Sequence, residues 1–156
     1  MLKTRIYVDT SVIGGCFDEE FEVYSNQLFA EFSSGKKRIV ISDIVLLELE
    51  EAPEKVKGIL TNVPEINIEY VFLNEESIYL ANAYLKEGVI FEDSLSDARH
   101  IAIATVERVD VLVSWNFKHI VNINRIRLLN SVNLKLGYPI LEIRSPREVL
   151  YEGQKI

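Results

Sequence analysis

The chain has 156 residues, of which 48% are hydrophobic and 26% charged, and its formal net charge is −7. This composition excludes a disordered chain, and no apolar run approaches the roughly 20 residues that a membrane helix needs. We expect one domain over 1–156 and no membrane partner. The first strand follows Thr4 with no room for a signal peptide, and the lone Cys16 has no internal disulfide partner, so we expect a cytoplasmic protein.

The acidic charge bears on the class of partner. Proteins that bind nucleic acid usually carry a basic face, so a net charge of −7 by itself favours another kind of partner. Alternatively, acids gathered around a divalent cation would be partly neutralised by it, leaving a small basic rim to hold a phosphate backbone. Composition leaves both interpretations open.

Segments rich in apolar and β-branched residues alternate with segments of helical periodicity along the chain. Strands are expected at 5–8, 38–42, 66–73, 111–114 and 139–143. Helices are expected at 22–33, 43–51, 53–60, 75–86 and 95–109, followed by a polar and apolar mixture over 116–136. Alternation of this kind predicts βαβ units, with helices on both faces of a mostly parallel sheet.

Acidic or amide side chains stand where strands are expected to end and helices to begin. Asp9 follows the first strand, Glu48 stands alone in an apolar helix, Asp97 opens a later helix, and Asn116 follows the fourth strand. In an open α/β sheet the ligand binds beyond the carboxyl ends of the strands. Acids that meet there repel one another unless a cation lies between them. The pattern predicts a site for a hard metal ion.

Each of these residues also has a structural interpretation. Asp9 and Asn116 suit a helix cap or a turn, and Asp97 lies three residues after Ser94, as in a capping box. Glu48 has no cation three or four positions away on its own helix. Burying its carboxylate without a partner would cost on the order of several kcal/mol. Taken alone, only Glu48 favours a functional role.

Taken together, the four positions are expected at the same edge of one sheet. Four unrelated helix caps need not all lie there. Tyr7-Val8-Asp9-Thr10-Ser11 and the segments 42–49, 97–102 and 113–117 resemble, in order and spacing, the PIN domain. This nuclease family includes the toxins of VapC-type toxin–antitoxin pairs, and the resemblance covers about 6–143. It implies a three-layer α/β/α sandwich around a central, mostly parallel sheet, with Mg²⁺ or Mn²⁺ and hydrolysis of RNA phosphodiester bonds.

By this resemblance, Asp9, Glu48, Asp97 and Asn116 are the catalytic and metal-binding residues. Asn116 stands where many relatives have a fourth acid, and an amide offers a carbonyl oxygen but no charge. We therefore expect one well-held metal ion and a weaker second one. A metal-bound water would attack the phosphorus in line, with Glu48 or Asp97 as its proton acceptor.

Polar residues beside these positions are candidates for holding the substrate: Thr10, Ser11, Arg99, Lys118 and His119. Arg99 lies two residues from Asp97 on a helix and so points in another direction, which makes packing or a salt bridge an equally good interpretation. Lys118 and His119 also suit an ordinary surface, and His100 suits a structural role.

Other classes fit less well. A phosphoaspartyl phosphatase needs a second Asp where this chain has Ser11, and a receiver domain needs an acid pair near the amino terminus. A decayed PIN-like protein that binds RNA or a protein without cleavage is the alternative, favoured by Asn116 and the −7 charge. We expect an endonucleolytic ribonuclease of VapC type, with RNA as substrate. An antitoxin partner and a homodimer are implied by the resemblance alone.

Overall fold

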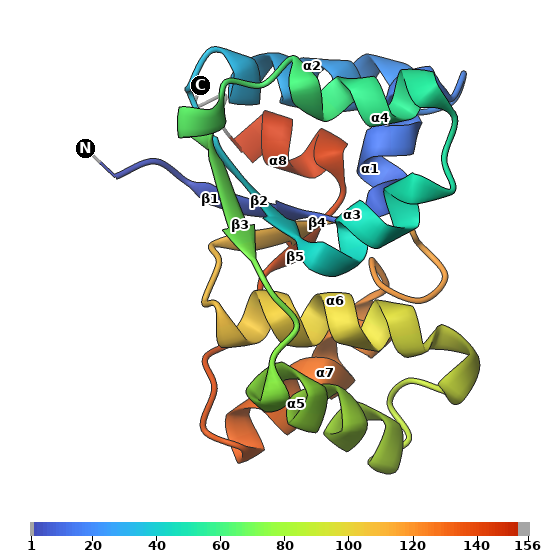
Figure 1. Cartoon of the computed structure of the whole chain (residues 1–156). Helices are drawn as coiled ribbons and strands as arrows, with labels where there is room; N and C mark the ends of the chain where they lie inside the picture. The colour runs from blue at the N-terminus through green and yellow to red at the C-terminus, as the bar shows by residue number, and fades with distance from the viewer. Residues whose placement is uncertain (1, 153–156) are drawn as a thin grey trace.

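The computed structural model describes residues 2–152, and within them a single five-stranded sheet lies at the centre of the molecule (Figure 1). The strand order is β3-β2-β1-β4-β5, and every neighbouring pair is parallel. The strands are β1 (Arg5–Val8), β2 (Arg38–Ser42), β3 (Ile68–Val71), β4 (Val111–Val113) and β5 (Ile143–Arg144).

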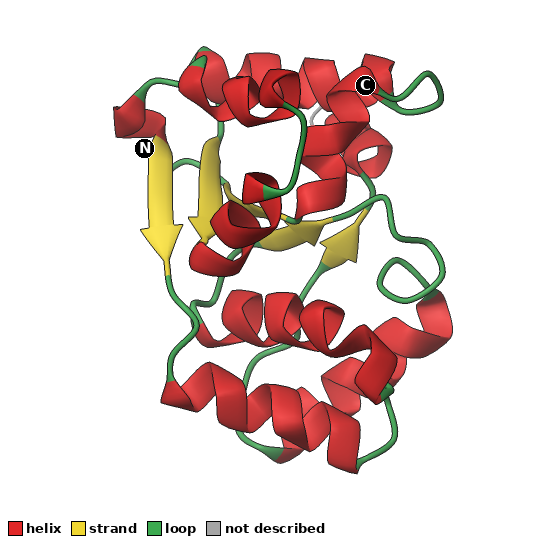
Figure 2. Ribbon diagram, turned by 45° about the vertical axis from the view of Figure 1, so that its right-hand side comes forward, coloured by secondary structure: helices red, strands yellow, loops and turns green. Residues whose placement is uncertain are grey.

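Helices cover both faces of this sheet (Figure 2). One layer consists of α1 (Thr10–Gly14), α2 (Glu22–Ser33), α3 (Asp43–Glu50), α4 (Glu54–Thr61) and α8 (Pro146–Glu152). The other layer consists of α5 (Glu75–Lys86), α6 (Leu95–Val106) and α7 (Ile123–Lys135). Short 3₁₀ helices lie at η1 (Gly15–Phe17), η2 (Glu65–Asn67) and η3 (Glu92–Ser94). The expected three-layer α/β/α sandwich with a parallel sheet is confirmed.

Strand β1 illustrates how the sequence builds the two cores. Successive side chains of a strand point to opposite faces. Tyr7 therefore packs with α5 and α6, whereas Ile6 and Val8 pack with α1 and α2. All three side chains are completely buried, as expected for a central strand of a parallel sheet covered on both faces. No helix in residues 2–152 is long and apolar enough to cross a membrane.

Most expected elements are confirmed, and the errors have local causes. Helix α6 ends at Val106 and not at 109, because Arg108 adopts a positive φ of 52° and the Val109 N–H returns to the Ala104 carbonyl. The segment 116–136 is helical only over α7, which Asn122 caps. The third strand starts late because η2 occupies 65–67. Helix α8 was not expected.

The strand expected at 139–143 is wrong except for its last residue. Strand β5 contains only two residues, and they are set by pairing with β4. The N–H of Leu112 donates to the carbonyl of Glu142, and the N–H of Ser114 donates to that of Arg144. A strand this short is fixed by its neighbour and has no periodicity of its own to predict it.

Candidate acidic site at the carboxyl edge of the sheet

Of the four residues predicted to act together, Asp9 and Asn116 follow strands directly or in the next turn, and Glu48 and Asp97 lie on helices. Asp9 directly follows β1, and Asn116 lies three residues beyond the end of β4. Ser42 ends β2 and starts α3, which carries Glu48, and Asp97 lies in the first turn of α6. Because β1 lies between β2 and β4 in a parallel sheet, the segments that follow these three strands leave the sheet at the same edge, and the hydrogen bond between Asn116 and Asp97 places the start of α6 there too.

Asp9 is both a helix cap and a buried acid. Its side chain is 5% exposed, and its Oδ1 accepts hydrogen bonds from the Ser11 hydroxyl at 2.6 Å and the Val12 N–H at 3.4 Å. Its Oδ2 accepts from the Ser114 hydroxyl at 2.5 Å. Burial raises the pKa of Asp9, and the hydrogen bonds from Ser11 and Ser114 oppose that shift. The cap interpretation was therefore correct, and it does not exclude a role as a ligand.

The two serines connect Asp9 by hydrogen bonds to the backbone after β4. The Trp115 N–H donates to the Ser11 hydroxyl oxygen at 3.0 Å, and the Asn116 N–H donates to that of Ser114 at 2.9 Å. Each hydroxyl then donates to one carboxylate oxygen of Asp9. The turn after β4 thereby fixes the orientation of the carboxylate that follows β1.

Asn116 is oriented differently from the expectation. Its Oδ1 accepts the His119 N–H at 2.9 Å, as a turn residue does, and its Nδ2 donates to Asp97 Oδ2 at 3.4 Å. The backbone donor identifies which amide atom is the oxygen, so the amide N–H and not the carbonyl oxygen faces Asp97. In this arrangement Asn116 is a hydrogen-bond donor to an acid of the site.

Glu48 finds its partners on other helices. Its Oε1 accepts from the Thr10 hydroxyl at 3.1 Å and lies 2.7 Å from His100 Nε2, while its Oε2 accepts from the Ser96 hydroxyl at 3.4 Å. Burial acts to raise the pKa of Glu48, but the hydrogen bond and the electrostatic attraction of His100, together with hydrogen bonds from Thr10 and Ser96, outweigh it and lower that pKa. The partner that Glu48 lacks on its own helix is thus His100 of α6.

Asp97 interacts electrostatically with both Asp9 and Glu48. Burial raises its pKa, and the negative charges of Asp9 and Glu48 raise it further. Within residues 2–152, no Lys or Arg forms an ion pair with any of these three acids. A cation among them would relieve both the repulsion and the burial cost, so the donor chemistry fits a divalent metal ion.

The side chains do not form a closed metal cage. No group of three or more His, Cys, Asp or Glu in the described part of the chain is arranged to hold an ion by itself. Mg²⁺ usually keeps several waters and is held by only one or two carboxylates, so such a cage is not what this ion requires.

The five residues expected to hold the substrate divide into two groups. Thr10 and Ser11 lie within the hydrogen-bond network of the acids, and His119 lies close enough to lower the pKa of Asp97. Arg99 is half-buried and Lys118 exposed, and neither side chain forms a hydrogen bond or ion pair with another residue of 2–152. A role of these two in holding phosphate stays a prediction.

Sequence reasoning missed the groups that hold the acids in place. Ser114 was treated as the end of a strand, and His100 as a structural residue. The available signal was spacing, since His100 lies one helical turn after Asp97 and Ser114 lies two residues before Asn116.

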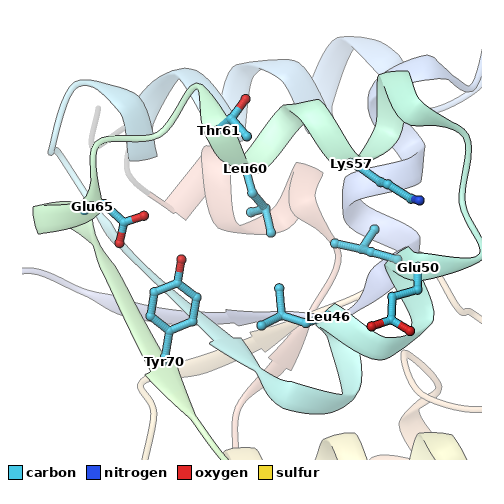
Figure 3. A pocket seen from close by; sticks show the side chains of 8 residues that line it. Leu46, Glu50, Lys57, Leu60, Thr61, Glu65 and Tyr70 are labelled. Atoms are coloured by element: carbon cyan, nitrogen blue, oxygen red, sulfur yellow. The ribbon is translucent and has the colours of Figure 1, made fainter.

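A separate cavity of about 320 Å³ lies between α3, α4 and β3 (Figure 3). Helix α3 contributes Leu46, Leu49 and Glu50 to it, whereas Glu48 of the same helix bonds to α1 and α6. The remaining lining residues are Lys57, Leu60, Thr61, Glu65 and Tyr70. None of the four predicted site residues lines this cavity.

Comparison with solved structures defines the fold as PIN-like, of the kind found in VapC toxins. No model of a known protein family matches the chain, and no curated protein sequence matches it. VapBC2 of Rickettsia felis, solved bound to a DNA fragment from its promoter, is 17% identical and superimposes with a TM-score of 0.56 over 91% of this chain and 98% of that one.

Two further structures give the same TM-score of 0.56. A toxin–antitoxin complex from Klebsiella pneumoniae is 18% identical over 77% of this chain and 93% of that one. VapC20 of Mycobacterium tuberculosis, described as a toxin that cleaves the sarcin–ricin loop, is 15% identical over 73% of this chain and 92% of that one. At these identities the similarity concerns the fold, and at that level the expected resemblance is confirmed.

Proposed function

We propose that this chain is a divalent-metal-dependent ribonuclease of VapC type, acting as one PIN-like domain. The observation that carries the proposal is the gathering of Asp9, Glu48 and Asp97 at the carboxyl edge of the sheet without a Lys or Arg partner in residues 2–152. The fold it shares with VapC20, a toxin described as cleaving the sarcin–ricin loop, supports the same conclusion.

In this proposal Asp9, Glu48 and Asp97 hold Mg²⁺ or Mn²⁺. When bound, such an ion lowers the pKa of a coordinated water and offsets negative charge on the phosphoryl oxygens. The chain itself contributes preorganisation. Ser11 and Ser114 fix both oxygens of Asp9, and the lowered pKa keeps Glu48 ionised at neutral pH.

Substrate binding falls to the groups around the acids. Thr10 and Ser11 lie beside the carboxylates, and Arg99, Lys118 and His119 are the basic candidates for holding the phosphate backbone. A few basic side chains in a chain of net charge −7 suit local contacts to one RNA segment, which agrees with endonucleolytic cleavage of a particular target.

We also propose an antitoxin partner and a homodimer, acting in the cytoplasm. Two of the similar structures are described as a VapBC protein and a toxin–antitoxin complex, and the chain covers almost the whole length of both matched chains. A partner that blocks the acidic edge would keep such a ribonuclease inactive until it is needed.

A second candidate is a PIN-like protein that binds RNA or a protein without cleaving. Asn116 favours it, because its carbonyl oxygen is taken by the His119 N–H and its amide N–H faces Asp97. A fourth acid at that position would add negative charge for a second metal ion, and the amide does not.

Metal binding and cleavage measured together separate the two candidates. We would titrate Mg²⁺ and Mn²⁺ into the wild type and Asp97→Asn by calorimetry, and assay both on a structured and a single-stranded RNA. Binding and cleavage in the wild type, both lost in Asp97→Asn, are expected. Glu69→Gln, which removes an acid from the opposite edge of the sheet, is the matched control and should retain both. A wild type that binds metal but cuts neither RNA would favour the decayed site.

A further inference from the structure

A buried chain of hydrogen bonds connects the core to Glu48. The Ser42 hydroxyl lies 2.7 Å from Tyr7 Oη, which lies 2.6 Å from His100 Nδ1, and His100 Nε2 lies 2.7 Å from Glu48 Oε1. Tyr7 and Ser42 are completely buried and His100 is 2% exposed. Buried polar groups are costly unless satisfied, and here each of the three buried side chains has a hydrogen-bond partner.

The carboxylate end of this chain fixes which atom donates there. The Val45 N–H donates to the Ser42 hydroxyl oxygen at 3.3 Å, and an ionised Glu48 can only accept. The Nε2–H of His100 therefore donates to Glu48. In the contacts of Tyr7 Oη with Ser42 and with His100 Nδ1, either atom can be the donor.

The contact from His100 is the shortest that Glu48 makes. The hydroxyls of Thr10 and Ser96 lie at 3.1 and 3.4 Å from the carboxylate, against 2.7 Å for His100. The Glu48 side chain is 40% exposed, whereas the His100 side chain is 3% exposed and its ring packs edge-on to Tyr7. A flexible carboxylate on a solvent-facing helix is thus anchored by a ring that the core holds rigidly.

We propose that His100, held by Tyr7, is the positioning residue that keeps the Glu48 carboxylate aimed at Asp9 and Asp97. This role rests on the proposed nuclease function for its effect on cleavage, but its geometry is testable without any activity. Groups behind a metal ligand orient it, and their loss typically reduces metal affinity or activity by roughly 10–100-fold.

A matched pair of variants isolates the contact with Glu48. His100→Gln places an amide nitrogen at the reach of Nε2 and retains the bond to Glu48, whereas His100→Asn reaches only the position of Nδ1. We expect His100→Asn to lower kcat of RNA cleavage about 10-fold or more with KM little changed, and His100→Gln to restore most of that loss. Equal kcat losses in both variants would overturn the proposal.

Tyrosine variants test whether the hydrogen-bond chain from Ser42 to Glu48 affects cleavage as well as stability. Tyr7→Phe removes the hydroxyl that holds His100, and Tyr84→Phe removes a comparably buried hydroxyl that bonds to Asn133 far from the acids. Both should lower the melting temperature, but only Tyr7→Phe should reduce kcat, by a few-fold. A reduction of the same size in Tyr84→Phe would assign the effect to general destabilisation and overturn the role of Tyr7.

Nitrogen-15 NMR of the histidine rings tests the geometry directly in the metal-free protein. We expect an Nε2–H signal from His100 that shifts in Glu48→Gln. An Nε2 that carries no proton, or a signal indifferent to Glu48→Gln, would overturn the inference. If the wild type cuts no RNA, the proposed function fails while these spectra still decide the position of His100.

Discussion

The acids at the two ends of strand β1 have different kinds of partner. At its start, the Arg5 guanidinium donates to both oxygens of Glu69, at 2.9 and 2.5 Å, and Arg38 adds a second cation at 3.6 Å. At its other end, Asp9 meets Glu48 and Asp97, and no Lys or Arg of residues 2–152 pairs with them.

The pKa values record this difference. The hydrogen bond from Arg5 lowers the pKa of Glu69, whereas burial raises the pKa of Asp9 and of Asp97. An acid with an arginine partner stabilises the fold as it stands. The ionised forms of Asp9 and Asp97, buried without such a partner, cost folding free energy, and a bound cation can return it. The comparison distinguishes a carboxylate paired with arginine from the carboxylates that we propose to hold a metal ion.

The largest expected effect comes from removing charge at the acidic edge. Asp9→Asn keeps a good helix-capping residue at the start of α1 but removes a buried carboxylate, so we expect RNA cleavage to fall by about 100-fold or more with the fold retained. Glu69→Gln should cleave at the wild-type rate. Comparable rates in Asp9→Asn and wild type would remove Asp9 from the catalytic residues.

A smaller effect is expected from metal on thermal stability. Mn²⁺ at 100 times its dissociation constant should stabilise the wild type by about 2.7 kcal/mol, or roughly 5–11 °C for a chain of this size, and a chelator should reverse the shift. Differential scanning calorimetry of wild type, Asp97→Asn and Glu69→Gln makes the comparison. Equal shifts in wild type and Asp97→Asn would place the ion away from the acidic edge.

The smallest effect is the dependence of stability on pH without metal. The folded-state pKa of Glu69 lies below its ordinary value of 4.5, so its stabilisation is present above that pH and lost as the pH falls through the lowered value. Glu69→Gln should therefore cost about 1 kcal/mol at pH 7 and less in acid.

The pH dependence of stability that we expect from Asp97 has the opposite sign. Its folded-state pKa lies above its ordinary value of 3.8, so ionising it costs stability as the pH rises through that window. Asp97→Asn should become more stable than the wild type between acid and neutral pH, as measured by urea unfolding in chelator. If Asp97→Asn instead lost unfolding free energy relative to wild type as the pH rose toward neutral, Asp97 would not be an acid whose ionisation destabilises the fold.

Local sequence signals determined the elements that local physics controls. Helices Glu22–Ser33 and Glu75–Lys86 were predicted with their observed bounds, since each has apolar residues at helical spacing. Gly35 and Gly88, both at positive φ, follow them closely. The order of Asp9, Glu48, Asp97 and Asn116 indicated the fold and the edge of the sheet where these residues lie.

Only the tertiary structure decided which partners these residues have. Glu48 and His100 are 52 positions apart, and Asp9 and Ser114 are 105 apart, so no local pattern joins either pair. The amide orientation of Asn116 depends on a turn, and strand β5 depends on β4. The sequence determined where negative charge gathers, because the ends of parallel strands meet at one edge. The folded chain determined how each carboxylate is held, because hydrogen bonds depend on distances that sequence separation does not contain.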